Sequence, residues 1–561
     1  MKKYKFDSIP VPPEVANDPQ LKLIDPILLS VIYKRGYRTV PEIMDFLTPD
    51  KTRVMRSYTM TGTDVAVQML EQAIRNKDHI VIYRDYDCDG ISAGAIAMEC
   101  LSALGAYVDH YANLRGIDGY GMCPAGVDSI LRKWPDTKLI LTVDNGITAH
   151  EGIRHAKDAG LQVIVTDHHE SGTELPPADV VIDPKQPGEI YPFQHLCGAG
   201  VIFKLMLALY AHMGKHIAPV MDTIDIVALA TVADVVPLVG ENRTLVKMGL
   251  EAINEARRPF FAAMLAKSEL KNLNAHYGVS FVLAPMVNSV SRLDEDTEFV
   301  VKMMLSNDPV WLSGAADKLI EMNEHRKEIT KAELELLEVS LAEQTKETDT
   351  AIIVRNDKLT EGVIGILAGR LKQKFNRPCI VFTKNDAGEL KGSARGCDGF
   401  ELKAALDSLP AGTLTSYGGH TKAAGLTLLP DKYDAFCREF TKLTDAAFQG
   451  SDFAEESVID EVLSESTCTK EFIHDLQYLE PFGEGFRQPL FGLVANVVET
   501  KYMGIEQQHV KYITERGISV IQWNRGDAAR ARKAPPKKFV GSPSLNVWHD
   551  ITTVQFICDD P

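Results

Sequence analysis

The sequence predicts an α/β protein built around a doubly wound, mainly parallel sheet, followed by a long helix, a smaller α/β domain and a small β-barrel. Apolar runs alternate with helical stretches from about residue 78, an amphipathic stretch spans residues 311–346, and short β-like segments with turn residues follow about residue 450. At 561 residues the chain exceeds what one hydrophobic core usually organises. We therefore expect an N-terminal extension at 1–60, the large α/β domain at 61–310, a connecting helix at 311–346, the smaller α/β domain at 347–450 and the barrel at 451–561.

The parallel sheet is predicted from four nearly continuous apolar runs, because strands buried on both faces lose the alternation of polar and apolar residues. Intervening segments such as Ser92–Leu104 and His150–Ala159 have the length and the Ala and Leu content of crossover helices. Helices between parallel strands are typical of a doubly wound sheet. The four predicted strands are His79–Tyr83, Lys138–Val143, Gln162–Thr166 and Val180–Ile182.

The second half of the chain is predicted to contain a long helix and two further domains. Leu319, Leu334 and Leu337 lie among Glu, Lys and Arg at helical spacing. An amphipathic helix packed on its neighbours is one interpretation, and a long helix that connects two lobes is the one we favour. Beyond it, Ala351–Val354 and Pro378–Phe382 have strand character, and the turn-rich composition after about residue 450 suits a small barrel.

Composition favours a reducing compartment and argues against a generally basic protein that coats duplex DNA. The formal net charge is −17 and the sequence pI about 5.4, although a local cationic groove is compatible with an acidic exterior. Nine cysteines occur without a CxxC pair, which indicates neither a disulfide framework nor structural zinc. The N-terminus leads into Pro-rich sequence and no apolar stretch is long enough to span a bilayer, so we expect a cytoplasmic protein without a signal peptide or a membrane partner.

Three aspartates, Asp85, Asp87 and Asp89, occupy alternate positions directly after the first predicted strand, and Gly90 then allows a turn into the next helix. In an extended segment these side chains point the same way, and their mutual repulsion is costly unless something compensates it. A solvated acidic turn is one alternative. A calcium loop of the EF-hand type is another, but its twelfth position, which needs a Glu, holds Ile96.

Further acids and histidines follow the next predicted strands. Taken singly, Asp144 suits a helix N-cap, His168 a hydrogen-bonded core histidine and Asp234 a buried acid that caps a loop. Together they predict a metal site, because open parallel sheets bind their ligands at the carboxyl ends of the strands. Carboxylates with one or two imidazoles and no thiolate suit Mn²⁺ or Mg²⁺ better than structural zinc. The number of acids indicates two divalent ions, a pair suited to phosphoester hydrolysis.

Four motifs follow one another along the chain, namely Asp85-Tyr86-Asp87-Cys88-Asp89-Gly90, Val143-Asp144-Asn145-Gly146, Asp167-His168-His169 and Ala230–Asp234. In this order they resemble the successive motifs of the DHH phosphoesterase superfamily. The resemblance implies supporting or catalytic roles for Asp85 and His169, and a bridging position between the ions for Asp144. The metal ligands that it implies are Asp87, Asp89, Asp144, His168 and Asp234.

Other segments of the chain narrow the resemblance to one family within this superfamily. These segments are Arg35-Gly36, Phe46–Pro49, Leu283–Pro285, Gly362–Ile366, Lys391–Arg395, Gly418–His420 and Leu479–Gly483. These segments resemble the RecJ family, which are single-stranded-DNA-specific 5′→3′ exonucleases of the DHH/DHHA1 superfamily. The resemblance covers essentially the whole chain and thins after about residue 500. It implies a DHH catalytic domain at 61–310, a DHHA1 substrate-binding domain at 347–450 and an OB-like nucleic-acid-binding domain at 451–561.

The resemblance also implies a set of substrate-binding residues. Lys391, Ser393 and Arg395 alternate on one side of an extended segment and suit a single phosphate, with an exposed strand edge as the alternative. Met286 and Ser291 stand where the family usually has Arg and Gly. The loss of that Arg puts part of the binding of the 5′ phosphate in doubt. The other implied residues are Asn288 and Arg292 at the end of the first lobe, Arg115 and Tyr120 where the strand end binds, Gly418 and Gly419 for close backbone approach, and His420 as a catalytic group at the scissile phosphate. Taken alone, Gly418-Gly419 also suits a plain turn, and Tyr120 a surface aromatic.

We therefore expect processive hydrolysis of single-stranded DNA from the 5′ end to mononucleotides, in DNA repair or recombination, with two Mn²⁺ or Mg²⁺ ions. The chain is expected to act as a monomer. A single-strand-binding protein and a helicase are the two alternatives for its protein partner. One rival is a DHH hydrolase of short RNA or cyclic dinucleotides, whose chains usually lack the barrel and the N-terminal extension. Another is a non-catalytic scaffold, which typically loses metal ligands. The basic segment Arg525–Lys538 suits either a binding loop or a solvated loop.

Overall fold

The computed structural model describes residues 2–49, 51–55, 60–113, 121–172, 174–268, 273–419, 421–450, 453–548 and 551–559. The chain divides into two compact units. The smaller unit combines Met1–Met55, Pro237–Lys247 and Ala454–Pro561, and the larger one combines Arg56–Val236 and Met248–Phe453. The chain therefore leaves the smaller unit and returns to it twice, so that neither unit is one continuous segment.

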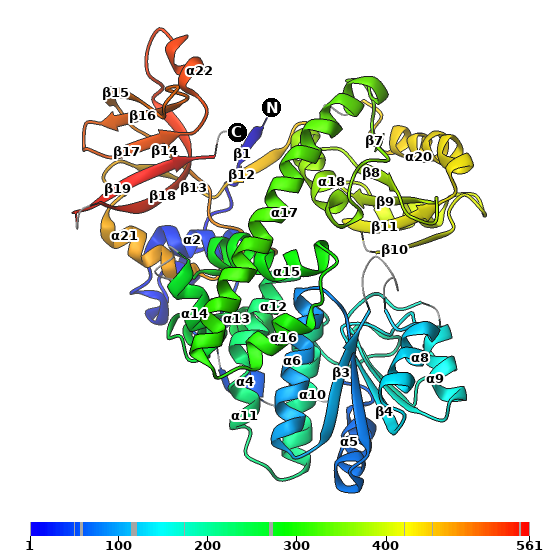
Figure 1. The fold of residues 1–561 in the computed structure, drawn as a ribbon. Coiled ribbons are helices and arrows are strands. Elements are labelled where there is room, and N and C mark those ends of the chain that lie inside the picture. Colours follow the sequence, from blue (N-terminus) through cyan, green and yellow to red (C-terminus); the bar gives the residue numbers. More distant parts are fainter. Residues whose placement is uncertain are drawn as a thin grey trace. The chain divides into compact units, whose positions relative to one another are not determined.

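The larger unit begins with a five-stranded, all-parallel sheet of order β3-β2-β4-β5-β6 (Figure 1). Helices α8 (Pro124–Lys133) and α9 (His150–Asp158) cover one face, where their side chains share a core with those of β2, β4 and β5. On the other side lie α6 (Cys88–Ala103) and α10 (Gly198–His212), which are almost entirely buried. The strands are β2 (His79–Arg84), β3 (Tyr107–Ala112), β4 (Thr137–Val143), β5 (Gln162–Thr166) and β6 (Val180–Ile182).

The prediction of a doubly wound α/β fold is confirmed. Two of the four predicted strands, β5 and β6, have exactly the predicted bounds, and the other two differ by one residue at one end. The strand β3 lies at one edge of the sheet, pairs only with β2, and is partly exposed along its length. It was not among the predicted strands because its residues, including Asp109 and His110, do not form an apolar run.

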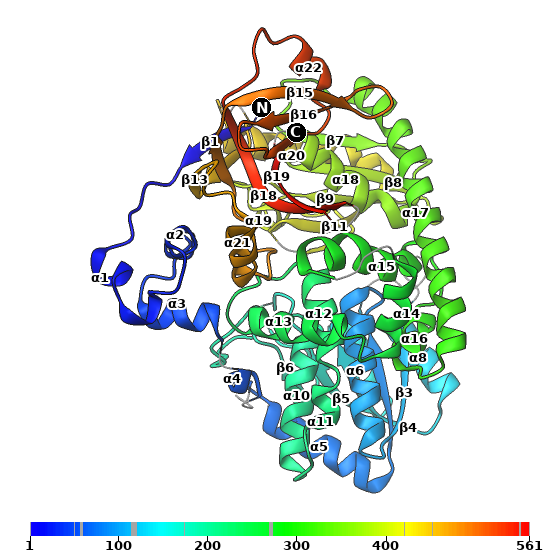
Figure 2. The ribbon, with the colours of Figure 1, turned by 90° about the vertical axis from the view of Figure 1, so that its left-hand side faces the viewer.

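The predicted connecting helix is confirmed as α17 (Pro309–Gln344), which starts and ends two residues earlier than expected. Asp308 caps its first turn by accepting hydrogen bonds from Val310 N and Trp311 N. Near its end, Leu337 and Leu341 pack into a core with β7 (Ile352–Arg355) and α18 (Glu361–Phe375). In Figure 2, α17 can be followed from the level of α14 (Pro259–Lys267) and α16 (Glu298–Leu305) to that of α18.

After α17 the chain forms the smaller α/β domain around a mixed sheet of order β10-β11-β9-β8-β7. Only β7 and β8 are parallel, and the remaining pairs are antiparallel. The helix α20 (Tyr433–Phe448) packs on this sheet through Phe436 and Phe440. The other strands are β8 (Cys379–Lys384), β9 (Leu390–Arg395), β10 (Ser416–Gly419) and β11 (Ala423–Leu428).

The smaller unit contains a seven-stranded sheet of order β13-β14-β18-β19-β17-β16-β15 in the region predicted to be a small barrel. Next to it, β1 (Lys3–Phe6) pairs in parallel with β12 (Glu456–Ile459), and α2 (Pro26–Lys34) and α3 (Val40–Leu47) share a core with the C-terminal strands. The N-terminal segment and the C-terminal region thus have one hydrophobic core in common. The strands are β13 (Glu461–Ser464), β14 (Phe491–Val494), β15 (Val497–Met503), β16 (His509–Thr514), β17 (Ser519–Gln522), β18 (Lys538–Trp548) and β19 (Ile551–Cys558).

Arg243, at the start of α13 (Gly240–Asn254), joins the three segments of the smaller unit. Its buried guanidinium donates to the carbonyl oxygens of Leu479, Glu480 and Pro481 and lies 3.8 Å from the ring centroid of Phe46. Burial lowers the pKa of Arg243 to about 10. We expect Arg243→Met to destabilise this unit by about 3 kcal/mol, because three buried carbonyl groups lose their donor. Urea unfolding of the full chain measures this as a lower transition midpoint.

The matched control is Arg257→Met, which makes the same change at an exposed arginine paired with Glu255. Exposed pairs of this kind contribute about 0–1 kcal/mol, so this variant should unfold close to the wild type. Equal midpoints for the two variants would contradict the role of Arg243.

None of the nine cysteines, all of which lie among the described residues, forms a disulfide bond, and most are buried. Among the described residues, no helix is both long enough and apolar enough to cross a membrane.

Candidate metal centre

Four parallel strands end in register at the same edge of the large sheet, and an aspartate follows each of them. Arg84 pairs with Val143, Val143 with Thr166, and Thr166 with Ile182. Neighbouring strands are about 4.8 Å apart, so the residues that follow form a short row along the edge. These residues are Asp85, Asp144, Asp167 and Asp183. Three of the four were predicted to lie there, and Asp183 was not.

The loop after β2 is held by its own aspartate and by one glycine. The Asp87 carboxylate caps α6, because its Oδ1 accepts from Asp89 N at 2.9 Å and from Gly90 N at 3.1 Å. A Cβ atom at Gly90 would lie 2.6 Å from the Cβ and the carbonyl oxygen of Asp85. The turn therefore requires glycine, and it brings Asp85, Asp87 and Asp144 together within 4.8 Å, measured between one carboxylate oxygen of each.

Asp89 lies in the first turn of α6 and contacts the first turn of α10. Its carboxylate accepts hydrogen bonds from Gly198 N at 2.6 Å and from Ala199 N at 2.8 Å. The N-terminus of a helix favours negative charge, which suits this arrangement. Burial and the nearby Asp87 nevertheless raise the pKa of Asp89 to about 6. Asp89 is thus fixed in position by two backbone N–H groups, although burial disfavours its charged form.

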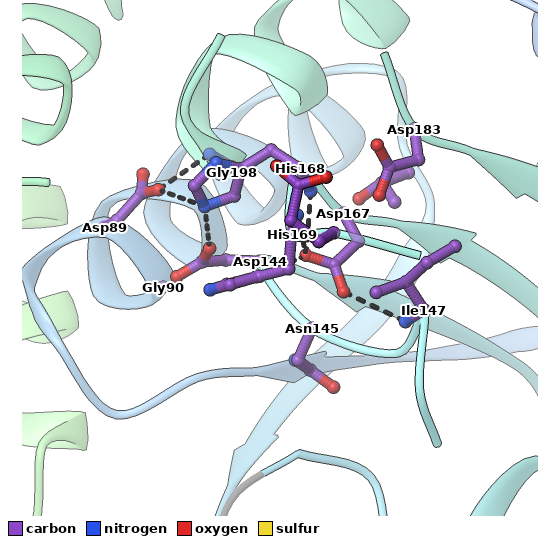
Figure 3. Close-up of polar contacts among 12 residues, drawn as sticks. Asp89, Gly90, Asp144, Asn145, Ile147, Asp167, His168, His169, Asp183 and Gly198 are labelled. Atoms are coloured by element: carbon purple, nitrogen blue, oxygen red, sulfur yellow. Dashed lines mark hydrogen bonds and ion pairs between the residues drawn. The ribbon is translucent and has the colours of Figure 1, made fainter. Parts of the chain in front are cut away.

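His168 follows β5 and lies among three of these carboxylates (Figure 3). Its Nε2 is 3.1 Å from Asp144 Oδ1, 3.6 Å from Asp89 Oδ2 and 3.7 Å from Asp234 Oδ2. Asp234 reaches this place from the C-terminal end of α12 (Ile224–Ala233), where it is the C-cap residue rather than a residue of the helix interior. Asp85 and Asp234 are 149 residues apart in the sequence, yet both belong to this one cluster of side chains.

The carboxylates of this centre are buried and repel one another, an arrangement that a bound cation would stabilise. Burial first, and then Asp89 and Asp87, raise the pKa of Asp144 well above its usual range, and the same causes raise the pKa of Asp234. Although the buried Asp144 Oδ1 lies 3.1 Å from His168 Nε2, it forms no hydrogen bond among the described residues. Oxygen-rich donor sets with an imidazole are those that Mn²⁺ and Mg²⁺ prefer. The residues present therefore fit divalent ions.

His169 lies next to this centre and is held by Asp167, a residue of the same motif that was not predicted to be a metal ligand or a catalytic group. The Nδ1 of His169 is 2.7 Å from Asp167 Oδ1, and Asp167 Oδ2 accepts from Ile147 N at 2.9 Å (Figure 3). Burial alone would lower the pKa of His169, but the Asp167 carboxylate outweighs it and raises the pKa to about 9. Asp167 is thus the group that orients His169 and keeps it charged.

Asn288 and Arg292 both lie on α15 (Ala284–Arg292) and contact backbone in the structure. The side-chain oxygen of Asn288 accepts from Cys88 N at 2.9 Å, so Asn288 supports the loop that carries Asp87 and Asp89. The Nη1 of Arg292 donates to the carbonyl oxygen of Gly362 at 3.2 Å. These contacts were not foreseen, because the sequence gives no signal for a pairing between positions 88 and 288.

Lys391, Ser393 and Arg395 alternate on one side of β9, as the sequence predicted, and all three are half-buried. The Nη1 of Arg395 donates to Ser393 Oγ at 3.0 Å, and Lys391 Nζ donates to Thr427 Oγ1 at 3.0 Å. A Cβ atom at Gly365 of α18 would lie 2.9 Å from the Arg395 guanidinium. The glycine therefore leaves space for this arginine beside the helix.

Gly418 and Gly419 end the exposed strand β10. Gly419 has a φ of 136°, and a Cβ atom there would lie 2.3 Å from the carbonyl oxygen of Ala423, so this position requires glycine. A Cβ atom at Gly418 would have no neighbour within 4 Å. Three predicted site residues, Arg115, Tyr120 and His420, lie outside the described residues.

Comparison with known proteins identifies three family models in this chain. They are the DHH family, N-terminal domain, at residues 79–231, the DHHA1 domain at residues 348–445 and the RecJ OB domain at residues 459–560. A similar curated protein is the single-stranded-DNA-specific exonuclease RecJ of Escherichia coli, which is 33% identical over 512 residues that cover 88% of this chain and 87% of the relative.

Two solved structures of RecJ from Thermus thermophilus are also similar. The one in complex with Mn²⁺ has a TM-score of 0.83 and 28% identity, and the match covers 99% of this chain and 79% of the other. The one in complex with Mg²⁺ has a TM-score of 0.77 and 26% identity, and covers 99% and 78%. Similarity thus extends over both units of the chain.

Proposed function

This chain belongs to the RecJ family, and on that basis we propose that it is an exonuclease that hydrolyses single-stranded DNA with divalent metal ions. The observation that carries the proposal is the group of carboxylates and imidazoles at the carboxyl edge of the parallel sheet. A scaffold that had lost its chemistry would have no reason to keep so many buried charges at a cost to stability. Relatives that carry Mn²⁺ and Mg²⁺ support the choice of metal.

We infer that five residues hold two divalent ions, with Asp144 between them. When bound, such ions lower the pKa of a water molecule and stabilise the charge that develops on the phosphate oxygens. Asp85 lies within reach of both Asp87 and Asp144 and is proposed to complete the site. The charged His169, fixed by Asp167, is suited to donate a proton or a hydrogen bond to the phosphate or the leaving oxygen. The five proposed metal ligands are Asp87, Asp89, Asp144, His168 and Asp234.

The substrate-binding residues are proposed from the family resemblance and from their positions. The half-buried Arg395 forms a planar fork next to Ser393, a combination that suits a phosphate group. Arg292 and Asn288 lie on the helix that supports the metal loop, which suits a role close to the strand end. The full proposed set comprises Arg115, Tyr120, Asn288, Arg292, Lys391, Ser393, Arg395, Gly418 and Gly419, with His420 as a further catalytic group.

The direction of digestion and the cellular setting are also part of the proposal. We expect digestion from the 5′ end to the 3′ end with mononucleotides as products, carried out by a monomer in the cytoplasm during DNA repair or recombination. The OB domain is proposed to supply backbone contacts and base stacking to the strand. A single-strand-binding protein or a helicase is the proposed type of partner.

Digestion of end-labelled strands tests the function. A single strand labelled at its 5′ end should release labelled mononucleotide at once in Mn²⁺ or Mg²⁺, whereas a 3′-labelled strand should shorten progressively. Chelation should abolish both reactions, because the carboxylates cannot activate water by themselves. A duplex of the same sequence and a dinucleotide serve as comparison substrates. Early release of the 3′ label would contradict the polarity, and faster cleavage of the dinucleotide would favour a hydrolase of short substrates instead.

A further inference from the structure

A lysine that no motif singles out, Lys185, lies just beyond the fourth strand end of the metal-binding edge. It follows Asp183 and Pro184 at the end of β6. Asp183 is completely buried and lies beside Asp167 and His169 in Figure 3. The row of strand ends that carries the carboxylates therefore continues directly into Lys185.

The backbone of Lys185 is held tightly. Its N–H donates to Asp183 Oδ1 at 2.7 Å, and Gln186 N donates to the carbonyl oxygen of Asp183 at 3.1 Å. The Gln186 side chain donates in turn to the carbonyl oxygen of Thr61 at 3.2 Å. These three hydrogen bonds fix the turn, so the position of the Lys185 Cα atom is well defined.

The ammonium group of Lys185, in contrast, has a weak and replaceable partner. Its Nζ lies 3.2 Å from Glu170 Oε1, in a pair whose lysine side chain is 21% exposed and whose glutamate side chain is 64% exposed. Because the glutamate is largely exposed to solvent, the pair contributes little free energy and a stronger anion can replace the glutamate. Glu170 directly follows the Asp167-His168-His169 motif, so the pair lies beside the metal centre.

The charge of Lys185 acts on that centre. Together with His169 it lowers the pKa of Asp234, against the larger effects of burial, Asp89 and Asp87, which raise it. Two divalent ions would bring four positive charges to the five carboxylates Asp85, Asp87, Asp89, Asp144 and Asp234. An anionic phosphodiester that enters such a site needs further positive charge from the protein.

We propose that Lys185 is a phosphate-contacting residue of this nuclease, held at rest by Glu170 and transferred to the scissile phosphodiester when the strand binds. The proposal rests on the proposed function and adds a cation to the substrate-binding residues given above. A lysine suits this task because its flexible stem carries a compact charge that can change partners. Glu170 acts as a competitor for this charge and sets how readily it is released.

A double-mutant cycle tests the proposal with Lys185→Met, Glu170→Gln and the combined variant. Affinity for a single-stranded oligonucleotide is measured with Mg²⁺ in the Asp144→Asn background, so that the strand survives. Lys185→Met should weaken binding about 5- to 10-fold and reduce the slope of log K against log salt by about 0.7, which is the contribution of one phosphate contact in a single strand. Glu170→Gln should strengthen binding about 2- to 5-fold, because the lysine is then free. The combined variant should match Lys185→Met.

The matched control is Lys157→Met, which removes a lysine paired with Asp179 near the amino ends of the same strands. It should bind and cut as the wild type does, whereas Lys185→Met with Asp144 intact should lose about 10-fold in kcat/KM. An unchanged affinity and salt slope for Lys185→Met would overturn the proposal. So would a gain from Glu170→Gln that persists without Lys185. Failure of wild-type protein to digest DNA would refute the proposed function instead, a result that the binding cycle does not depend on.

Discussion

Replacement of Asp144 by asparagine is expected to lower the rate of DNA digestion about 10³-fold or more, equivalent to about 4 kcal/mol of transition-state stabilisation. Asp144 follows β4 at the middle of the carboxyl edge, and its Oδ1 lies 3.1 Å from His168 Nε2. Asparagine keeps the size of the side chain and tolerates the φ of 61° found at this position, whereas alanine tolerates it less well. The loss is measured as kcat on a 5′-labelled strand with saturating Mn²⁺.

The same variant should be more stable than the wild type in the presence of chelator. Burial and the neighbouring Asp89 raise the pKa of Asp144, so its ionisation costs folding free energy. The amide never ionises, and its advantage should therefore be absent at acid pH and grow as pH rises above the carboxyl pKa of the unfolded chain. Thermal melting of the metal-free proteins at several pH values measures it. Asp158→Asn, at an exposed position of α9, is the control and should change neither rate nor stability.

If Asp144→Asn kept the wild-type kcat after contaminating nucleases had been removed, Asp144 would have no essential role in the reaction. A lower melting temperature in chelator would show that the carboxylate stabilises the metal-free fold, contrary to the electrostatic argument.

The second large effect is expected from Gly198→Ala. A Cβ atom at Gly198 would lie 2.5 Å from Asp144 Cβ and 2.8 Å from Asp144 Cα, and backbone atoms cannot move aside as a side chain can. The same residue donates its N–H to Asp89 at 2.6 Å. One added methyl group would therefore displace two carboxylates, and a misplacement of about 1 Å can cost about 10²-fold in rate. We expect a loss of that size in kcat/KM and weaker retention of Mn²⁺.

Gly200→Ala provides the matched comparison, since Gly200 is also buried in the first turn of α10. The nearest atoms to a Cβ there belong to the side chain of Leu196, at 3.3 and 3.4 Å, which can adjust. This variant should digest DNA at close to the wild-type rate, and its helix should gain slightly in stability. If both glycine variants lose activity equally, the effect lies in the helix and not in the contact with Asp144.

The sequence was sufficient to predict four of the five strands of the large sheet and the gathering of acids and histidines at its edge, because both depend on local patterns. Asp85, Asp144 and His168 come directly after apolar runs, and parallel strands place such residues at one edge. Asp183 follows the strand Val180–Ile182 in the same way, so the same rule applied to the fourth strand would have found it. Gly198 carries no such signal. Its importance follows from the packing of α10 against Asp144, a contact between residues far apart in the chain.

Other features could not be predicted because they depend on pairing between distant segments. The contact of Asn288 with Cys88 N and the guanidinium of Arg243 among the carbonyl groups of 479–481 are of this kind. The expected domain bounds, with residues 1–60 as a separate extension, remain a proposal. In the structure, Lys3–Phe6 forms a strand pair with Glu456–Ile459, and the two regions share one core.

This shared core has a consequence for synthesis of the protein. On the ribosome, Leu28, Ile32 and Phe46 emerge first, but the residues that cover them, such as Phe486 and Phe491, are translated more than 400 positions later. The apolar side chains of the N-terminal helices therefore stay exposed to solvent while the central α/β domains are made and fold. Contacts between segments so far apart in the sequence also form slowly. A stop codon before residue 454 would remove most of the residues that cover these helices and expose their apolar side chains to proteases and aggregation.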